Sequence, residues 1–203
     1  MFTRIAPFIF YDSTFLPDDA AARARAEVES WSGWIPAHAG RYKDDRLIES
    51  KEIKELRDVL VNRRSLTSDN EASLRIKDAI AEANSCFKVD NIYASRYVVS
   101  KYTLGCHIKP HTDTDFFNTS RIYTGVYYLN ADYGGGDIYF PKHNISVKPE
   151  SSSLLVFFSE YLHGITPITS GTRFSIVWFG LAEAMWNTLI APPGIARKQQ
   201  IGS

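Results

Sequence analysis

The stretch HTDTDFFNTSRIYTGVYYLN, residues 111–130, joins a polar segment to a run of aromatic and β-branched residues. The run that starts at Arg121 is typical of a buried β-strand. The polar segment places His111 two residues before Asp113, and alternate residues of an extended chain point to the same side. These two side chains could therefore reach one metal ion, although most pairs with this spacing are polar surface residues.

Further β-rich runs separated by turns fill the chain from Tyr93 onward. No helical pattern interrupts them, which indicates an antiparallel sandwich or barrel and not alternating βαβ units. The glycines at 134–136 are interpreted as a loop, because no strand-to-helix junction surrounds them as phosphate binding would require. The predicted strands lie within IYASRYVVSKY (92–102), RIYTGVYYLN (121–130), DIYFP (137–141), ISVKP (145–149), SLLVFF (153–158) and TRFSIVWFG (172–180).

Up to about residue 90 the pattern is largely helical. An acidic start and an alanine-rich continuation predict a helix that begins at Asp18. A second helix is predicted over 68–87, where apolar residues recur on one face. Ser68 and Glu71 have the spacing of a capping box at its start. This second helix is expected to lie against the sheet.

The chain has 203 residues, a length that suits a single domain with a substantial core. We divide it into a helical support region at 1–90, a β-rich core at 91–182 and a C-terminal tail at 183–203. The tail is rich in Pro and Gly and polar, so it is expected to be frayed.

Composition excludes several kinds of partner. There are 23 Lys and Arg against 23 Asp and Glu, so no overall basic field would attract nucleic acid or an anionic membrane. No apolar stretch is long enough to span a bilayer, and the N-terminus lacks the pattern of a signal peptide. We expect a soluble, cytoplasmic protein whose oligomeric state the sequence leaves open. Cys86 and Cys106 are interpreted as reduced thiols, with a disulfide as the alternative.

A third metal ligand is needed, because iron(II) used for oxygen chemistry is commonly held by two histidines and one carboxylate. His163 follows an apolar strand and suits that role, although a lone histidine is more often a hydrogen-bonded structural residue. Arg173 and Ser175 follow on one face of a predicted strand, where they could bind a carboxylate. An unpaired arginine buried there would be very costly. The other histidines considered as ligands are His38, His107 and His143.

Three stretches of the β-rich part carry ordered motifs. YTLGCHIKPHTD (102–113) is similar to a Y-x-x-G lead into H-x-D, YYLNADYGGGDIYFP (127–141) is similar to YLN…GGE…FP, and LHGITPITSGTRFSIVWF (162–179) is similar to an HGV.PV..G.R close. Through these motifs the segment from about Tyr93 to Phe179 resembles the iron(II)/2-oxoglutarate-dependent dioxygenases, and within them the prolyl-4-hydroxylase-like branch of small prokaryotic or phage type. That resemblance implies a mainly β protein with N-terminal helices, built on a double-stranded β-helix, the jelly-roll or cupin-like core, flanked by helices.

The resemblance also implies an activity. His111, Asp113 and His163 would bind iron(II) as the catalytic centre, with 2-oxoglutarate and O₂ as cosubstrates. The protein would hydroxylate an amino-acid-like substrate and release succinate and CO₂. That substrate is either a peptidyl proline or other residue, or a free amino acid or small natural-product intermediate.

Further residues acquire roles from the same resemblance. Arg173 would pair with the distal carboxylate of 2-oxoglutarate, with Ser175 and the hydroxyl of Tyr102 as further donors. Arg121 aligns with a basic position near the substrate mouth, and a solvated arginine at a strand end is the alternative reading of it.

Three departures from the family pattern leave the substrate open. Asp137 stands where the family usually has Glu, Ser152 where many members have Gly, and Arg173 where many prolyl hydroxylases have Lys. A non-catalytic jelly-roll binding or 2-oxoglutarate-sensing module remains the alternative function. Repair of alkylated nucleic acid by the same chemistry is disfavoured by the lack of net positive charge.

Overall fold

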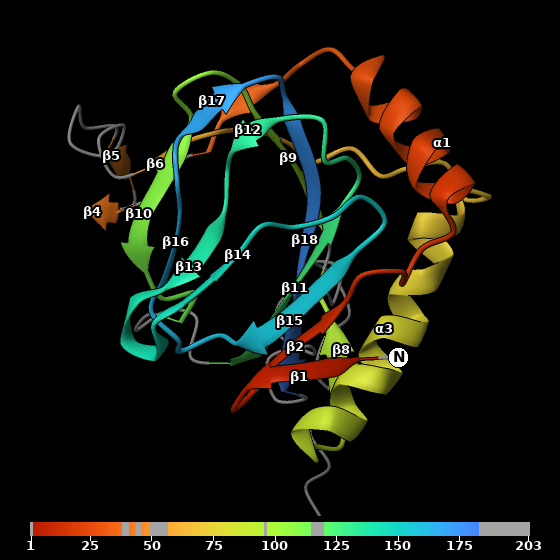
Figure 1. The fold of residues 1–203 in the computed structure, drawn as a ribbon, viewed down its shortest axis with the longest axis vertical. Helices are drawn as coiled ribbons and strands as arrows, with labels where there is room; N and C mark the ends of the chain where they lie inside the picture. The colour runs from red at the N-terminus through yellow and green to blue at the C-terminus, as the bar shows by residue number, and fades with distance from the viewer. Residues whose placement is uncertain are drawn as a thin grey trace, which may run out of the picture.

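Two antiparallel β-sheets face each other across a cavity in the computed structural model (Figure 1). This arrangement is the double-stranded β-helix that the resemblance implies. The structure describes residues 2–37, 41–43, 46–48, 57–95, 97–114 and 120–182.

The larger sheet has nine strands. In spatial order they are β1 (Thr3–Ala6), β2 (Ile9–Asp12), β15 (Leu154–Phe158), β11 (Arg121–Tyr128), β18 (Arg173–Ala182), β9 (Val98–Tyr102), β7 (Leu60–Asn62) and β3 (Ile35–Pro36), with β8 (Ile92–Ala94) paired to β18. Strand β11 lies between β15 and β18, both of which are distant from it in the sequence. Pairing of this kind is non-local, so the sheet forms only when the whole core assembles.

The smaller sheet has five strands and carries the polar motif identified in the sequence. Its order is β14 (Ile145–Val147), β13 (Ile138–Phe140), β16 (His163–Ile165), β10 (His107–His111) and β6 (Arg57–Asp58). The remaining elements are the pairs β12 (Gly134–Gly135) with β17 (Ile168–Ser170) and β4 (Arg41–Lys43) with β5 (Arg46–Ile48), and the short 3₁₀ helix η1 (Pro141–His143).

Strand β11 separates two environments, because successive side chains of a strand point to opposite faces. Tyr123 and Tyr127 pack in the cluster that the helices cover. Thr124 and Val126 line the cavity, and Tyr128 packs beside Val126 in the second apolar cluster. The tyrosines of β11 are thus buried on both faces of the sheet.

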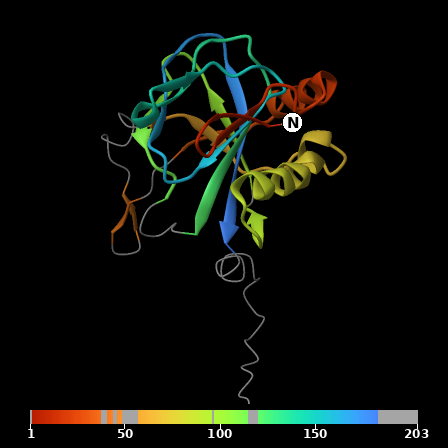
Figure 2. The ribbon, with the colours of Figure 1, turned by 60° about the horizontal axis from the view of Figure 1, so that its bottom comes forward.

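Two helices cover the outer face of the larger sheet, α1 (Asp18–Glu29) and α3 (Glu71–Phe87). Figures 1 and 2 show both on the same side of that sheet. Alanines fully buried on both helices allow a close approach to the sheet, and the Tyr123 hydroxyl donates a 2.6 Å hydrogen bond to Oδ1 of Asn84 on α3. The predicted packing of the second helix against the sheet is confirmed.

The start of α3 differs from the sequence prediction. Asn70, and not Ser68, is the N-cap residue: its Oδ1 accepts a 3.1 Å hydrogen bond from the backbone N–H of Ala72. Its Nδ2 also donates to Glu27 Oε2 at 2.8 Å, which ties α3 to α1. Asparagine caps a helix as well as serine does, and this second contact exists only in the folded chain.

The description of residues 1–90 as largely helical was incomplete, because strands from this region extend both sheets. β2 pairs with β15, β7 pairs with β9, and β6 pairs with β10 at the edge of the smaller sheet. These segments have only two to four residues each. Such short strands carry too little periodicity to be recognised, and pairing with the central strands stabilises them.

The glycine cluster is also more ordered than a loop. Gly134 and Gly135 form β12 and pair with β17, and Gly135 has a φ of +67°, where a side chain would be strained. Any Cβ at Gly135 would collide with the carbonyl oxygen of Pro167. The glycines therefore permit a close approach of two backbones and do not cradle a phosphate.

Two further findings concern the cysteines and the length of the helices. Cys86 and Cys106 are both free thiols, as interpreted from the sequence. Within the described part of the chain, no helix combines the length and the apolar character that crossing a bilayer demands.

Candidate active site

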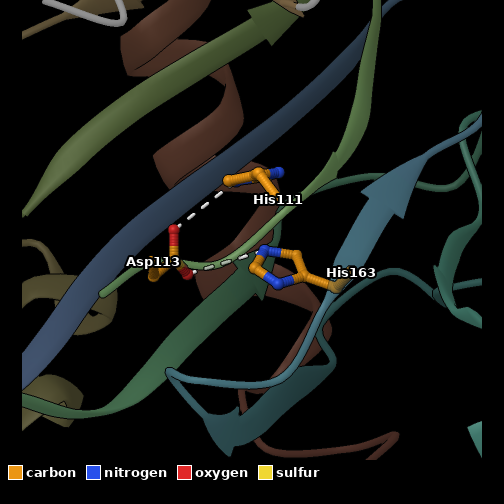
Figure 3. A group of neighbouring side chains, drawn as sticks. All are labelled: His111, Asp113 and His163. Carbon is orange, nitrogen blue, oxygen red and sulfur yellow. Dashed lines mark ion pairs between the residues drawn. The ribbon is translucent and has the colours of Figure 1, made fainter. Parts of the chain in front are cut away.

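Three side chains converge at the cavity: His111, Asp113 and His163 (Figure 3). His111 ends β10, His163 begins β16, and the antiparallel pairing of the two strands sets these histidines directly opposite each other. Nε2 of His111 lies 3.6 Å from one carboxylate oxygen of Asp113, and Nε2 of His163 lies 3.5 Å from the other. One donor atom from each residue falls within 4.8 Å of the others. The HxD pair and the distant histidine are thus brought to one point.

Backbone hydrogen bonds orient both imidazoles. Nδ1 of His111 lies 3.1 Å from the carbonyl oxygen of Lys109, and Nδ1 of His163 lies 2.9 Å from that of Tyr161. A carbonyl only accepts, so each Nδ1 carries a hydrogen, and Nε2 of each ring is directed toward the Asp113 carboxylate. Two imidazole nitrogens and a carboxylate are ligand types that bind divalent transition metals. The donor set therefore fits a metal ion of the type held by two histidines and a carboxylate.

Asp113 is held ionised. Burial alone would raise the pKa of its carboxyl group, but interactions with His111 and His163 and a hydrogen bond from Thr124 hold that pKa well below its usual range. The backbone of Asp113 is fixed as well: its N–H donates to the carbonyl of Ser159 at 2.9 Å. A carboxylate is the form in which aspartate ligates a metal.

A cavity of about 270 Å³ opens from the three residues into the space between the sheets. One side is formed by strands of the smaller sheet and the other by β7, β9, β18, β11 and β15 of the larger sheet. Its lining is Ala37, Val59, Val61, Arg63, Val98, Ser100, Tyr102, Ile108, His111, Asp113, Arg121, Thr124, Val126, Ile138, Phe157, His163, Ile165, Arg173, Val177 and Phe179.

Arg173 is a buried cation on the wall of this cavity, 1% exposed. Its guanidinium lies 4.6 Å from the centre of the Tyr102 ring and 4.8 Å from that of Tyr128, and Nη1 donates to the Gly136 carbonyl at 2.8 Å. Its Nε has no hydrogen-bond partner, and no carboxylate of the described residues pairs with it. Burying a guanidinium without a counter-charge is costly, so this site is built to receive an anion.

Two hydroxyl groups on the same face of the sheet as Arg173 also lack hydrogen-bond partners. Oγ of Ser175 and Oη of Tyr128 are both buried without a hydrogen-bond partner, and the two residues are register partners on β18 and β11. Burial raises the pKa of Tyr128, so its phenol stays protonated and can donate. An anion beside Arg173 would satisfy these donors.

Tyr128 was missed in the sequence reasoning. Alternation along β11 places it on the face of Thr124, but only the pairing with β18 sets it next to Arg173 and Ser175. The sequence offered no signal for that neighbour, because strand order is not encoded in the local pattern.

The predicted donor Tyr102 and the substrate candidate Arg121 both line the cavity. Tyr102 is the register partner of Arg173 on β9. Nη1 of Arg121 donates to the backbone carbonyl of Asp113 at 2.9 Å, and its guanidinium lies 3.7 Å from the centre of the Phe179 ring. These two contacts hold Arg121 at the cavity wall, and its role toward a substrate stays a prediction.

The other histidines lie away from the metal-binding group. Nδ1 of His107 lies 3.0 Å from the Gly105 carbonyl, and the ring of His143 lies 4.2 Å from that of Tyr161, centre to centre. Neither lines the cavity. His38 falls outside the described residues.

Comparison with known proteins agrees with this geometry. Residues 97–180, which contain the three converging residues and Arg173, match the family model of the 2OG-Fe(II) oxygenase superfamily. Prolyl 3-hydroxylase 3 of Mus musculus is 35% identical over 77 residues, which are 34% of this chain and 10% of that protein. The chain thus spans about a tenth of the length of this curated relative.

Two solved structures share the fold over most of both chains. A viral collagen prolyl hydroxylase from Paramecium Bursaria Chlorella virus-1, in complex with 2-oxoglutarate, has a TM-score of 0.65 at 18% identity, covering 86% of this chain and 96% of that one. A prolyl hydroxylase from Trichoplax adhaerens, in complex with a hypoxia inducible factor peptide fragment, has a TM-score of 0.69 at 16% identity, covering 92% and 89%. The segment 97–180 of this chain is thus similar to the 2OG-Fe(II) oxygenase superfamily, and the chain as a whole has the fold of the prolyl hydroxylases.

Proposed function

We propose that this protein is an iron(II)- and 2-oxoglutarate-dependent hydroxylase of an amino-acid-like substrate. The observation that carries the proposal is that one cavity holds both the His111–Asp113–His163 group and Arg173, a buried cation with no carboxylate partner among the described residues. A metal centre and an anion anchor in one cavity are what a keto-acid cosubstrate needs at its two ends.

Each group then has a task. His111, Asp113 and His163 hold iron(II) through two Nε2 atoms and a carboxylate, with Thr124 fixing the carboxylate. The metal and its cosubstrates together supply the oxidising power that converts a substrate C–H bond to C–OH while 2-oxoglutarate is split to succinate and CO₂.

Arg173 binds the distal carboxylate of 2-oxoglutarate. Ser175 and Tyr128 donate to that carboxylate, because their hydroxyls are buried beside the guanidinium without other partners. Tyr102 closes the other face of the guanidinium, with its ring 4.6 Å away. The apolar lining from Val126, Phe157 and Ile165 excludes water from the space between the two ends.

The similar structure from Trichoplax adhaerens contains a peptide fragment, and the viral one is a collagen prolyl hydroxylase. These relatives favour a peptidyl substrate, and a free amino acid remains the other form of an amino-acid-like substrate.

The test begins without oxygen. Iron(II) and then 2-oxoglutarate are added anaerobically, and a metal-to-ligand charge-transfer band is expected in the visible spectrum. Asp113→Ala should lose that band while its circular dichroism stays that of the wild type. A wild-type protein that binds iron(II) and shows no such band on addition of 2-oxoglutarate would contradict the proposal.

Turnover is then screened in air over free amino acids and Pro-containing peptides. Release of succinate together with a gain of one oxygen atom by the substrate is expected for the wild type and not for Asp113→Ala. Succinate release distinguishes the hydroxylase from a module that only binds 2-oxoglutarate.

A further inference from the structure

Part of the cavity wall comes from outside the segment that matches the family model. Residues 97–180 supply the metal-binding group and Arg173, whereas Ala37, Val59, Val61 and Arg63 precede that segment. The chemistry and the anion anchor thus belong to the shared core. The wall around β7 belongs to this chain's own N-terminal part, and a wall of that kind is suited to choosing the substrate.

Arg63 directly follows β7 at this wall. The strand pairs with β9 so that Val61 faces Ser100 and Asn62 faces Val99. Val61 and Arg63 both line the cavity, as alternation along an extended chain requires, while Asn62 turns away and donates to the Ser32 carbonyl. Arg63 itself is exposed, and among the described residues its guanidinium has no hydrogen bond or ion pair.

The next residue points elsewhere. The guanidinium of Arg64 lies 5.4 Å from the centre of the Trp31 ring, and Arg64 is not part of the cavity lining. Two adjacent arginines therefore carry the same charge on opposite sides of the chain. Only one of them faces the cavity.

The cavity has an excess of positive charge. Its described lining contains three arginines, Arg63, Arg121 and Arg173, against the single carboxylate of Asp113. In the proposed complex, the charge of iron(II) and of Arg173 balances that of Asp113 and of the dianionic 2-oxoglutarate. Arg63 is left without a counter-charge among the described lining residues. Arg121 already donates to the Asp113 carbonyl and stacks on Phe179, which fixes its position at the mouth.

Arg63 directly follows β7, whereas Arg121 begins β11. β7 is separated from β11 by β9 and β18, which makes three strand spacings, or roughly 14 Å at about 4.8 Å each. Their side chains therefore approach the cavity from two sides. A substrate that enters along β7 meets the positive charge of Arg63.

We propose that the substrate carries a carboxylate close to the carbon that is oxidised, and that Arg63 recognises it. This inference rests on the proposed function of the same cavity. The carboxylate has two possible sources: the α-carboxylate of a free amino acid, or an acidic side chain beside the target residue in a peptide. Both present the same planar anion to a guanidinium, which binds it through paired hydrogen bonds.

The experiment compares substrates that differ only in this charge. Its first arm sets L-proline and other free amino acids against their amides. The second arm sets proline peptides flanked by Asp or Glu against the same peptides flanked by Asn or Gln. Substrate oxidation and succinate release are measured for the wild type, for Arg63→Gln and for Arg64→Gln as the matched control.

The acid of one arm is expected to be oxidised at least about tenfold more efficiently than its amide. Arg63→Gln should lower kcat/KM for that acid about tenfold. The kcat/KM for the amide and the KM for 2-oxoglutarate should both stay at their wild-type values. Arg64→Gln should behave as the wild type. The arm in which the preference is found identifies the source of the carboxylate.

Any other ordering overturns the inference: amides used as well as acids, no acid oxidised at all, or Arg63→Gln lowering both members of a pair equally. The anaerobic charge-transfer band keeps this result separate from the proposed function. A wild-type protein that shows the band but no preference for acids retains the oxygenase assignment and loses only the role of Arg63.

Discussion

Thr124 and Asp113 are joined by a 2.6 Å hydrogen bond from the threonine hydroxyl to Oδ2 of the carboxylate. The same hydroxyl lies 2.9 Å from Oγ of Ser159, and both residues are almost fully buried. This hydrogen bond fixes one oxygen of the Asp113 carboxylate and orients the carboxylate toward the two histidines. Groups that hold a ligand in this way commonly change metal affinity ten- to a hundredfold.

We therefore expect Thr124→Val to weaken metal binding about tenfold or more, because the isosteric side chain keeps the packing and loses the donor. Anaerobic titration with Mn(II), followed by electron paramagnetic resonance, measures this directly. Thr3→Val, an exposed change on β1, serves as the control. An unchanged affinity in Thr124→Val would show that Asp113 is positioned without this bond.

Replacing Arg173 by Leu should raise the KM for 2-oxoglutarate about 30- to 160-fold, because hydrogen bonds to a charged group are worth roughly 2–3 kcal/mol. Arg173→Lys keeps the charge but loses the paired hydrogen bonds of the guanidinium. Its KM for 2-oxoglutarate should therefore lie between those of the wild type and Arg173→Leu. Affinity for Mn(II) should stay the same in both variants. A KM that does not change in Arg173→Lys or Arg173→Leu would remove the anchor role.

Tyr128→Phe should raise the KM for 2-oxoglutarate about tenfold, the effect of losing one donor worth about 1.4 kcal/mol. The matched control is Tyr123→Phe on the opposite face of β11, whose hydroxyl donates to Asn84. That change should lower stability and leave the KM as it is. Equal KM values for Tyr128→Phe and the wild type would mean that the orphaned hydroxyl does not reach the cosubstrate.

Ser152, which stands where many family members have glycine, has a φ of +67°. Its hydroxyl donates a 2.8 Å hydrogen bond to Oδ1 of Asp18, and its backbone N–H donates to the Tyr128 carbonyl. Backbone strain of about 1–2 kcal/mol in this conformation is thus offset by a side-chain contact to the start of α1.

Ser152→Gly should change the free energy of unfolding by less than about 1 kcal/mol, since it loses the hydrogen bond and relieves the strain together. Ser152→Ala loses the bond and keeps the strain, so it should be less stable than Ser152→Gly by about 1 kcal/mol. Urea denaturation compares the three proteins. The reverse order of the two variants would show that the strain is not present.

The local sequence determined much of the site. Alternation in an extended chain put His111 and Asp113 on one side, and the same alternation put Arg173 and Ser175 on one face of a strand. His163 was singled out because it follows an apolar run. The structure brings His111, Asp113, His163 and Arg173 to one cavity, and Ser175 is buried two residues from Arg173 on the same strand. Residues i and i+2 of an extended segment point to the same side whatever the tertiary structure, because this relation depends only on the local backbone.

Only the tertiary structure decided which strands are neighbours. The pairing of β11 with β18 sets Tyr128 beside Arg173, the pairing of β2 with β15 adds N-terminal strands to the sheet, and the pairing of β7 with β9 brings Arg63 to the cavity. Strand order follows from how separate apolar faces combine into one core. The residues next to a side chain in the sequence therefore do not predict a contact that it makes across such a strand pairing.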